Sequence, residues 1–237
     1  MEKKTALIIA IAMIICAIIL GSFFYSARRP VNIIRVVGYA AGEYDSDILK
    51  WVLTLSATAP SNNQIQGIQA LTRDIRRFRE FLGNNGFDVN GLEINPSYNW
   101  PNYNRDGNIV NYNFEQRIAF TLRDVARFEE VEHFAVDLTD IAATGINIRN
   151  STLEYYLSEL PDIKIDIIGE ATRDARVRAE EVARTTNTRL GKLRNGRVGV
   201  FQITEPLSVE VQSMGIFSTN TRRKQISVTM TGEFELK

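Results

Sequence analysis

The sequence predicts an α+β fold with a mostly antiparallel sheet, preceded by one transmembrane helix. Three observations lead to this prediction. Residues 6–25 carry no charged side chain. Segments with the alternating pattern of half-buried strands occur in pairs, and a helix with one apolar face follows each pair. A long helix whose apolar stripe is built from alanine occupies the second half of the chain. Repeated strand-strand-helix units of this kind indicate helices packed on an antiparallel sheet.

The first element is the uncharged segment Ala6–Tyr25. As a helix it would reach about 30 Å, the thickness of the hydrocarbon core of a bilayer. Lys3 and Lys4 precede it, and Arg28 and Arg29 follow it. A cleaved secretory signal is the alternative, but its apolar part is usually shorter, about 7–15 residues. The sequence therefore favours an uncleaved anchor over residues 1–29, with the lipid bilayer as the partner of Ala6–Tyr25.

The remaining residues, 30–237, are predicted to form one soluble α+β domain. The basic residues on the two sides of the anchor nearly balance, so the positive-inside rule barely decides the orientation. A single N-terminal span ahead of a domain usually places that domain outside the cytoplasm. We therefore expect a single-pass protein of the inner (cytoplasmic) membrane whose soluble domain faces the periplasm or the cell exterior.

Composition excludes several classes of function. The chain has 28 Lys and Arg against 28 Asp and Glu, so it lacks the basic excess that nucleic-acid binding requires. Its one cysteine, Cys16, lies inside the uncharged segment. The soluble region therefore has neither a disulfide nor a thiol nucleophile.

The first half of the soluble region reads as two strands, a helix and further strands. Strands are predicted over Ile33–Ala40 and Ile48–Thr58, with a turn over Gly42–Asp47 between them. A helix over Asn63–Leu82 follows, and a strand over Leu92–Trp100 is broken at Pro96. A long strand is then predicted over Ile109–Arg123. The apolar stripe of the helix comprises Ile65, Ile68, Leu71, Ile75, Phe78 and Leu82.

The second half repeats the pattern. A helix over Val125–Ala142, capped by Asp124, precedes a strand over Ile146–Leu157. Pro161 opens a long helix that runs to Thr186. Its small stripe predicts close packing on a sheet or on a partner helix. The stripe comprises Ala171, Ala175, Ala179, Val182 and Ala183. The last predicted strands are Arg197–Glu205, Leu207–Gln212 and Gln225–Leu236.

Residues for catalysis are scarce, and we assign no catalytic, cofactor-binding or metal-binding residue. His133 is the only histidine and stands in a charged helical run, which favours a surface position. Asp45 and Asp47 are consistent with a carboxylate pair, but a turn that begins a strand explains them as well. A glycine-rich phosphate loop after a strand is absent from the sequence. An enzyme is the least favoured of three hypotheses, and it would need a deep pocket lined by these residues.

Three further motifs have a structural and a functional interpretation. Asn102–Gly107 imitates the first half of a calcium-binding loop, but the twelfth position is Asn113 rather than glutamate, which favours a polar turn between strands. Asn150-Ser151-Thr152 matches a glycosylation signal inside a predicted strand. The arginine-rich run Arg73–Arg79 is more typical of a solvated helix face than of an anion site.

A segment rich in aromatic and amide side chains is the best candidate for binding. It spans Tyr98–Tyr112 and combines two kinds of side chain that often meet glycans or peptides. The aromatic members are Tyr98, Trp100, Tyr103 and Tyr112, and the amides are Asn99, Asn102, Asn104 and Asn111. The alternative is that these residues only build the end of a hairpin.

The order of several short motifs resembles the SIMPL-domain family, the YggE-like bacterial envelope proteins. The resemblance covers about residues 33–205 and extends toward Leu236. Its strongest part is the alanine helix followed by Leu190–Leu193. The other motifs are Val37–Ala40, Asp47, Gly86-Phe87, Tyr112, Leu122–Asp124, Gly145–Asn147, Asp174–Arg176 and Ala179-Glu180. Asn187 stands where a glycine is common in the family.

The resemblance implies an extracytoplasmic α+β protein without an established enzymatic activity. Some relatives assemble into homo-oligomers and some are linked to oxidative-stress tolerance. Our first hypothesis is therefore a membrane-anchored, non-enzymatic envelope protein that self-associates. The second is a ligand- or partner-binding module of the envelope that uses the 98–112 segment.

Overall fold

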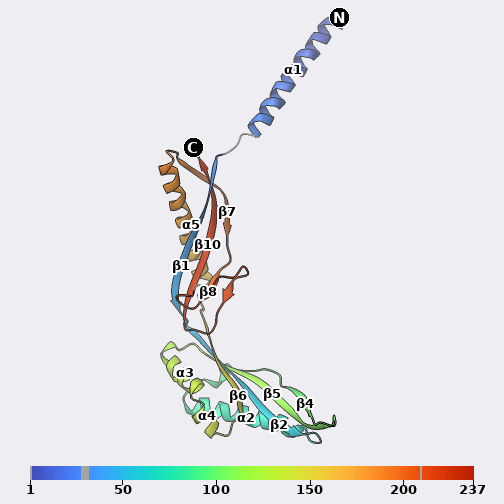
Figure 1. Cartoon of the computed structure of the whole chain (residues 1–237), viewed down its shortest axis with the longest axis vertical. Helices are drawn as coiled ribbons and strands as arrows, with labels where there is room; N and C mark the ends of the chain where they lie inside the picture. Colours follow the sequence, from blue (N-terminus) through green and yellow to red (C-terminus); the bar gives the residue numbers. More distant parts are fainter. Residues whose placement is uncertain (1, 28–31, 209) are drawn as a thin grey trace. The chain divides into compact units, whose positions relative to one another are not determined.

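The computed structural model describes residues 2–27, 32–208 and 210–237 (Figure 1). These residues form two compact units. The first unit contains the chain up to Tyr39, residues 170–199 and residues 229–237. The second contains residues 40–169 and 200–228. The chain thus passes from one unit to the other four times: twice within a strand, once within a helix and once between two strands.

The N-terminal segment is a helix, α1, which spans Glu2–Ala27. Its described side chains, those of residue 8 and residues 11–25, are exposed. Arg28 and Arg29, which follow the predicted anchor, lie outside the described residues. Across the described part of the chain, no helix meets both the length and the apolarity that a membrane span requires.

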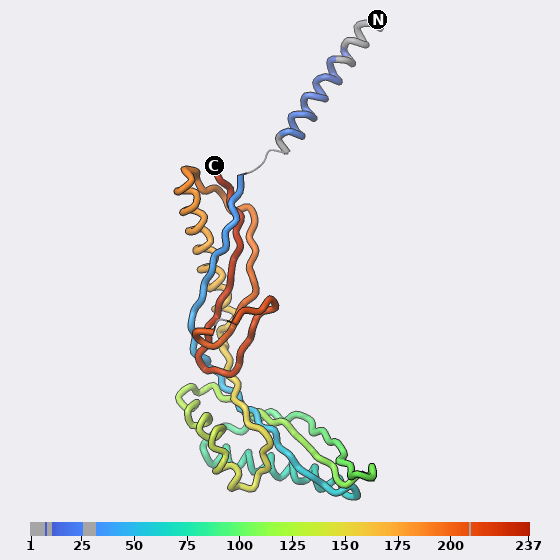
Figure 2. Tube along the Cα trace, viewed as in Figure 1, coloured from blue at the N-terminus to red at the C-terminus, as the bar shows by residue number. Residues whose placement is uncertain are grey.

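One five-stranded sheet is formed by strands from the two ends of the chain. Its strands are β1 (Ile33–Asp45), β7 (Leu190–Val198), β8 (Gln202–Thr204), β9 (Ile216–Phe217) and β10 (Arg223–Leu236). Their order is β1-β10-β8-β9, and β7 also pairs with β10. The pairs of β10 with β7 and with β8 are antiparallel, whereas β8 and β9 are parallel. In Figure 2 the blue β1 and the red β10 run side by side.

In the first unit, the contact between helix and sheet is formed by small side chains. Helix α5 (Leu160–Thr185) lies beside β1 and β10 in this unit (Figure 1). Four alanines of its predicted stripe are fully or almost fully buried: Ala171, Ala175, Ala179 and Ala183. A Cβ atom at Gly38 of β1 would overlap the backbone of Ala171 and Ala175. The predicted close approach is therefore confirmed, and the sheet is the element that the helix approaches.

Helix α5 ends in a way that explains the departure at position 187. Asn187 follows the helix with a φ of 55°. Asparagine tolerates this left-handed conformation better than most non-glycine residues do. Asn187 thus adopts a backbone conformation that favours glycine, the residue that the family resemblance leads one to expect at this position.

The second unit has a sheet covered by helices on one face. Strands β3 (Leu92–Ile94), β5 (Ile109–Leu122), β2 (Ile48–Pro60) and β6 (Ile148–Tyr156) lie in the order β3-β5-β2-β6, and β4 (Tyr98–Tyr103) also pairs with β5. All these pairs are antiparallel. The helical elements are α2 (Ile65–Asn84), α3 (Phe128–Val136), α4 (Thr139–Ala143) and the short turns η1 (Val89–Gly91) and η2 (Val125–Arg127). Large side chains such as Trp51, Phe78, Phe114, Phe120 and Phe128 fill the core.

Four details of the predicted fold were wrong. Strand β1 continues to Asp45, and β1 and β2 belong to different sheets, so they are not a two-strand unit. The strand predicted over Arg197–Glu205 is divided, because β7 begins at Leu190 and β8 at Gln202. The segment 207–212 contains no strand in its described residues, all but 209. The predicted helix over 125–142 is divided into η2, α3 and α4.

The division of that helix has a local cause. Asp137 has an extended backbone, and its carboxylate accepts a hydrogen bond from the amide of Thr139 at 3.0 Å. The extended Asp137 therefore ends α3, and a separate helix, α4, begins at Thr139. The predicted cap at Asp124 is confirmed, since its side chain accepts from the amide of Ala126 at 3.2 Å.

The apolar stripe predicted for α2 is rotated in the structure. Ile65 and Ile68 are exposed, whereas Gly67 and Asp74 are buried. A Cβ atom at Gly67 would overlap the ring of Phe114, so the glycine lets that ring lie directly on the helix. The Asp74 carboxylate accepts a hydrogen bond from the amide of Asn147 at 3.1 Å. The buried face thus includes two residues that a hydrophobic pattern does not count.

Candidate functional site

The second sheet presents a polar face opposite its helices. Along β5, Phe114, Ile118 and Phe120 point into the core, so the odd-numbered residues of this strand point to the other side. Cross-strand register aligns three rows on that side: Tyr98, Glu115 and Ser56; Trp100, Asn113 and Thr58; and Asn102, Asn111 and Pro60. We call the following residues the aromatic–amide face: Tyr98, Trp100, Asn102, Asn111, Asn113, Glu115, Thr58 and Arg149.

An aromatic pair forms the centre of this face. The rings of Tyr98 and Trp100 lie 5.5 Å apart with an angle of 23° between their planes, so they are stacked. The guanidinium carbon of Arg149 lies 5.8 Å from the centre of the Trp100 ring, within the range of a cation–π contact. The Tyr98 ring remains accessible to a ligand, since 57% of Tyr98 is exposed.

A buried carboxylate holds the pair in place. Glu115 is only 5% exposed, accepts a hydrogen bond from the Tyr98 hydroxyl and forms an ion pair with Arg149. One carboxylate therefore fixes both ends of the Tyr98–Trp100–Arg149 arrangement. Because a buried carboxylate without a cation is costly, the ion pair also keeps Arg149 at this position.

Amide side chains extend the face along the hairpin. The Asn102 amide nitrogen donates to the Asn111 oxygen at 2.5 Å, and the Asn113 nitrogen donates to the Asn102 oxygen at 3.2 Å. The hydroxyl of Thr58 donates to the Asn113 oxygen at 3.3 Å. The four side chains form a connected row next to the aromatic pair.

The structure brings together only part of the predicted aromatic cluster. Tyr98 and Trp100 share the face, but Tyr112 points to the opposite side and packs against the core. Tyr103 lies beyond a register shift in β4 and is 63% exposed. Glu115 and Arg149 were missed, because they lie outside the 98–112 segment and only the sheet register brings them to it.

The loop that imitates a calcium site is the turn of the β4–β5 hairpin. The side-chain oxygen of Asn104 accepts hydrogen bonds from the amides of Asp106 at 3.0 Å and Asn108 at 2.9 Å. Gly107 adopts a φ of 81°. The oxygen best placed to bind a cation is thus used to close the turn, which matches the interpretation as a polar turn.

The remaining sequence candidates lie apart from this face. Both carboxylate oxygens of Asp47 accept hydrogen bonds from Ser158, from its amide and from its hydroxyl. Burial raises the pKa of Asp47, but these hydrogen bonds outweigh it, so the pKa lies below the usual value. Asp45 is exposed at the end of β1, and His133 is exposed on α3. Asp47 therefore ties the start of β2 to the segment after β6.

Two other motifs have structural roles. Within the arginine-rich run, Arg77 donates to the carbonyl of Gly145 at 2.8 Å and so fixes the turn before β6. In the glycosylation signal, the amide of Asn150 donates to the Thr152 hydroxyl at 3.0 Å, and both residues belong to β6.

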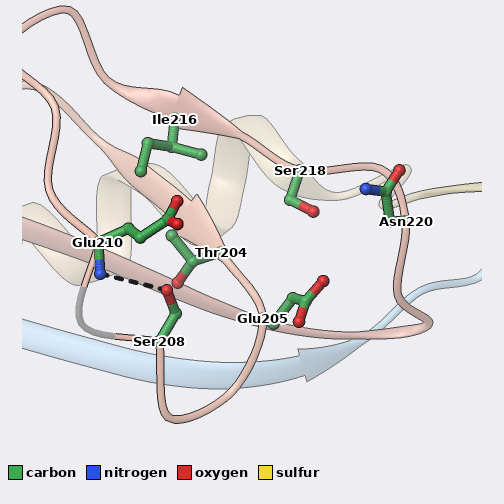
Figure 3. Close-up of a pocket in the computed structure, with 7 residues that line it drawn as sticks. All are labelled: Thr204, Glu205, Ser208, Glu210, Ile216, Ser218 and Asn220. Carbon is green, nitrogen blue, oxygen red and sulfur yellow. Dashed lines mark hydrogen bonds between the residues drawn. The ribbon is translucent and has the colours of Figure 1, made fainter.

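A second feature is a polar pocket of about 360 Å³ in the second unit (Figure 3). Thr204, Glu205, Ser208, Glu210, Ile216, Ser218 and Asn220 line it. Lys224 lies close by and is 1% exposed, and its ammonium donates to the carbonyls of Ser218 at 2.7 Å and Thr221 at 3.0 Å. Burial lowers the pKa of Lys224 to about 8, and the nearby Glu205 carboxylate opposes this shift.

The sequence did not lead us to predict a buried Lys224, although its position in the alternating pattern of β10 indicates one. Ile226, Val228 and Met230 occupy the buried face of β10, and Lys224 has the same parity. A lysine at a buried strand position needs hydrogen-bond partners, which the 218–221 turn supplies. Among the residues that the structure describes, no group of three or more histidine, cysteine or carboxylate side chains could hold a metal ion.

Comparison with known proteins identifies the family. The sequence profile of the SIMPL family, described as a protein of unknown function (DUF541), matches residues 34–234. No curated protein matches the chain. The match covers all of the second unit and, of the first unit, all but residues 1–33 and the last three residues, so it includes the alanine helix and the aromatic–amide face. The chain therefore belongs to the SIMPL family.

Proposed function

We propose that this SIMPL protein is a membrane-anchored, extracytoplasmic envelope protein that binds a ligand or partner on its aromatic–amide face. The observation that carries the proposal is the buried Glu115 carboxylate, which binds both Tyr98 and Arg149, the two side chains that contact the Trp100 ring. A buried charged group that orients partly exposed side chains is typical of a preorganised binding surface. The proposal includes no catalytic step.

The anchor in this proposal rests on the sequence. The uncharged stretch continues from Ala6 to Tyr25. Of this stretch, the structure describes the side chains of residue 8 and residues 11–25, and all of them are exposed. A helix that exposes so many large apolar side chains is costly in water and stable in lipid. We place the anchor in the inner membrane, with the two units facing the periplasm or the cell exterior.

The anchor is tested by extraction of the full-length protein from membranes. Alkaline carbonate removes peripheral proteins, so an anchored chain is expected to stay in the membrane pellet. A variant that carries Ile11→Arg, Ile15→Arg and Ile18→Arg should move to the supernatant, because each charge opposes insertion by about 2.5–3.5 kcal/mol. Release of the unaltered protein by carbonate, or a mature chain that lacks its first residues, would contradict the anchor.

The binding surface is tested by capture from detergent-solubilised envelopes. Full-length protein should retain a component that the variant Tyr98→Ala/Trp100→Ala loses. Tyr103→Ala is the matched control, because Tyr103 belongs to the same hairpin but not to the stack. Retention of the same components by all three proteins would exclude the face as the binding surface.

Self-association is a second candidate function, favoured by the first unit. On β1, Ile33, Val37 and Tyr39 are each about half exposed on the side away from α5. A shared membrane confines such domains and raises their effective concentration, so weak contacts between copies can suffice. The family resemblance also implies a role in oxidative stress, but it assigns this role to no particular residue of the chain.

The mass of the intact assembly in detergent tests this second candidate. An oligomer should dissociate in the variant Val37→Glu/Tyr39→Glu, whereas Ile65→Glu/Ile68→Glu on α2 serves as a control of equal polarity. A monomeric mass for the unaltered protein at all concentrations would reject self-association.

A further inference from the structure

The aromatic–amide face has the chemistry of a glycan-binding surface. We propose that it takes a neutral glycan chain, one sugar ring of which stacks on Tyr98 while its hydroxyl groups bind the neighbouring amides. This inference rests on the proposed function, because it names the class of ligand for the same face.

The charges on the face indicate a neutral ligand. Glu115 and Arg149 neutralise each other. Lys50 pairs with Glu93 at 2.7 Å, and Arg117 pairs with Glu154 at 3.2 Å, in rows of the same sheet face. Each charge near the aromatic pair thus has a partner of opposite sign. An anionic or cationic ligand would have to break one of these pairs, whereas a neutral one would not.

The aromatic pair provides the apolar part of such a surface. The rings are stacked at 23°, and Glu115 fixes the hydroxyl of Tyr98, so the exposed ring is already oriented before a ligand arrives. A sugar ring has one side made mainly of C–H groups, and this side packs on a flat aromatic ring. Fixing the ring in advance lowers the entropy that binding must overcome.

The amide row provides the polar part. An amide side chain both donates and accepts hydrogen bonds, as a sugar hydroxyl group does. Asn102, Asn111 and Asn113 stand next to the aromatic pair and are linked to one another, so their free donors and acceptors have fixed directions. A row of fixed amides along a strand fits a chain of successive hydroxyl-bearing rings.

The backbone argues against an extended peptide as the ligand. Among the described strands, β4 pairs only with β5, so its other edge is the place where a peptide strand would add. Pro101 lies inside β4, and Pro96 separates β3 from β4. Proline has no amide hydrogen, so this edge lacks the continuous donors that strand addition requires. With strand addition disfavoured, a ligand must be recognised by the side chains of the face, which is how proteins bind glycans.

The two tryptophans of the chain allow a direct test. Trp51 is fully buried in the core, whereas Trp100 is part of the face. Full-length protein is kept in a detergent without a sugar head group, such as dodecyldimethylamine oxide. Chitotetraose, cellotetraose and maltotetraose are titrated, and quenching of tryptophan fluorescence by acrylamide is measured at each step. At least one of these glycans is expected to protect Trp100 in a saturable manner.

Variants separate binding from folding. Trp100→Phe keeps a ring and should keep binding in calorimetry, but its fluorescence, from Trp51 alone, should not respond. Tyr98→Ala should weaken binding about tenfold, as expected for loss of one stacked ring contact. Tyr103→Ala is the matched control and should change the affinity less than about twofold. Far-UV circular dichroism and the emission of Trp51 verify that each variant is folded.

Three outcomes would overturn the inference. One is the absence of saturable protection by any of the three glycans. Another is equal binding by the unaltered protein and by Tyr98→Ala. The third is saturable binding of a charged glycan or of an extended peptide in place of the neutral glycans. If envelope capture still depends on Tyr98 and Trp100 in any of these cases, the binding surface stands and only the class of ligand is wrong.

Discussion

The helix–sheet contacts of the two compact units are built from side chains of very different size. In the first unit a helix reaches the sheet through Ala171, Ala175 and Gly38, so backbone meets backbone. In the second unit Trp51, Phe78 and Phe120 fill a wider space between sheet and helices. The first arrangement depends on the absence of side-chain atoms and the second on their presence. The two units should therefore fail under opposite kinds of substitution.

The largest expected effect is in the large-residue core. Phe120 is almost completely buried, and its ring meets that of Phe87 edge to face at 5.5 Å. Phe120→Ala should lower the free energy of unfolding by about 3–5 kcal/mol. Urea unfolding followed by Trp51 emission measures this loss. Phe217→Ala, at a residue that is half exposed, should cost less than about 1 kcal/mol, and similar losses for the two variants would refute the packing contrast.

The small-residue interface should respond to added volume. The new methyl group in Gly38→Ala overlaps the backbone of α5, so the helix must shift, at a cost of about 1–3 kcal/mol. Gly169→Ala is the control, because nothing lies within 4 Å of a Cβ atom there, and the helix should gain about 0.5–1 kcal/mol. Hydrogen exchange should show faster exchange over 170–185 in Gly38→Ala alone. Equal exchange rates over 170–185 in the two variants would contradict a tight contact between Gly38 and α5.

Lys224 is a buried charged residue in the second unit, in contrast to the apolar core residues. Its pKa of about 8 lies below the unfolded value of 10.5, so the unfolded chain binds the proton more tightly between these values. Stability should therefore rise as the pH increases from about 8 to about 10. Lys224→Met should abolish this rise and cost about 1–3 kcal/mol at neutral pH, because the carbonyls of Ser218 and Thr221 lose their donor. A pH dependence identical to that of the unaltered protein would contradict this role.

The smallest expected effect concerns the edge of β1. The Asp174 carboxylate accepts a hydrogen bond from the Tyr39 amide at 2.8 Å, and this bond, with that from Arg178, holds the pKa of Asp174 below its usual value. The contact is therefore present at neutral pH and lost in acid. Asp174→Ala should speed exchange of the Tyr39 amide, measured by NMR. Glu181→Ala, on the same helix, should not change it; the same exchange rate in both variants would exclude the contact.

The parts of the fold that sequence could predict are those that depend on local spacing. The alanine stripe predicted a close-packed helix, and alternation predicted β2, β5 and most of β10. Partner choice between strands is not local. The pattern of β1 is equally compatible with pairing to β2, yet it pairs with β10, almost the whole chain away. Gly67 and Asp74 complete the buried face of α2 without being hydrophobic, so periodicity alone placed the stripe too far toward Ile65 and Ile68.

The candidate site shows the same limit. Tyr98 and Trp100 were predicted as members of a cluster because they are close in sequence. Tyr112 was included for the same reason, although its parity on β5 sends it to the core. Glu115 and Arg149 give the site its rigidity, and only the register of β4, β5, β2 and β6 brings them to the aromatic pair. Spacing identified the segment, and tertiary pairing decided which of its residues act together.

The most direct test of the proposed binding surface is carbene footprinting of the full-length protein in its own membranes and after purification. The extent of labelling is compared at three residues of one hairpin: Tyr98, Trp100 and Tyr103. We predict that Tyr98 and Trp100 are protected in the membranes and become labelled after purification, whereas Tyr103 is labelled equally in both. Equal labelling of Tyr98 and Trp100 in the two preparations would contradict the claim that a ligand or partner occupies the aromatic–amide face.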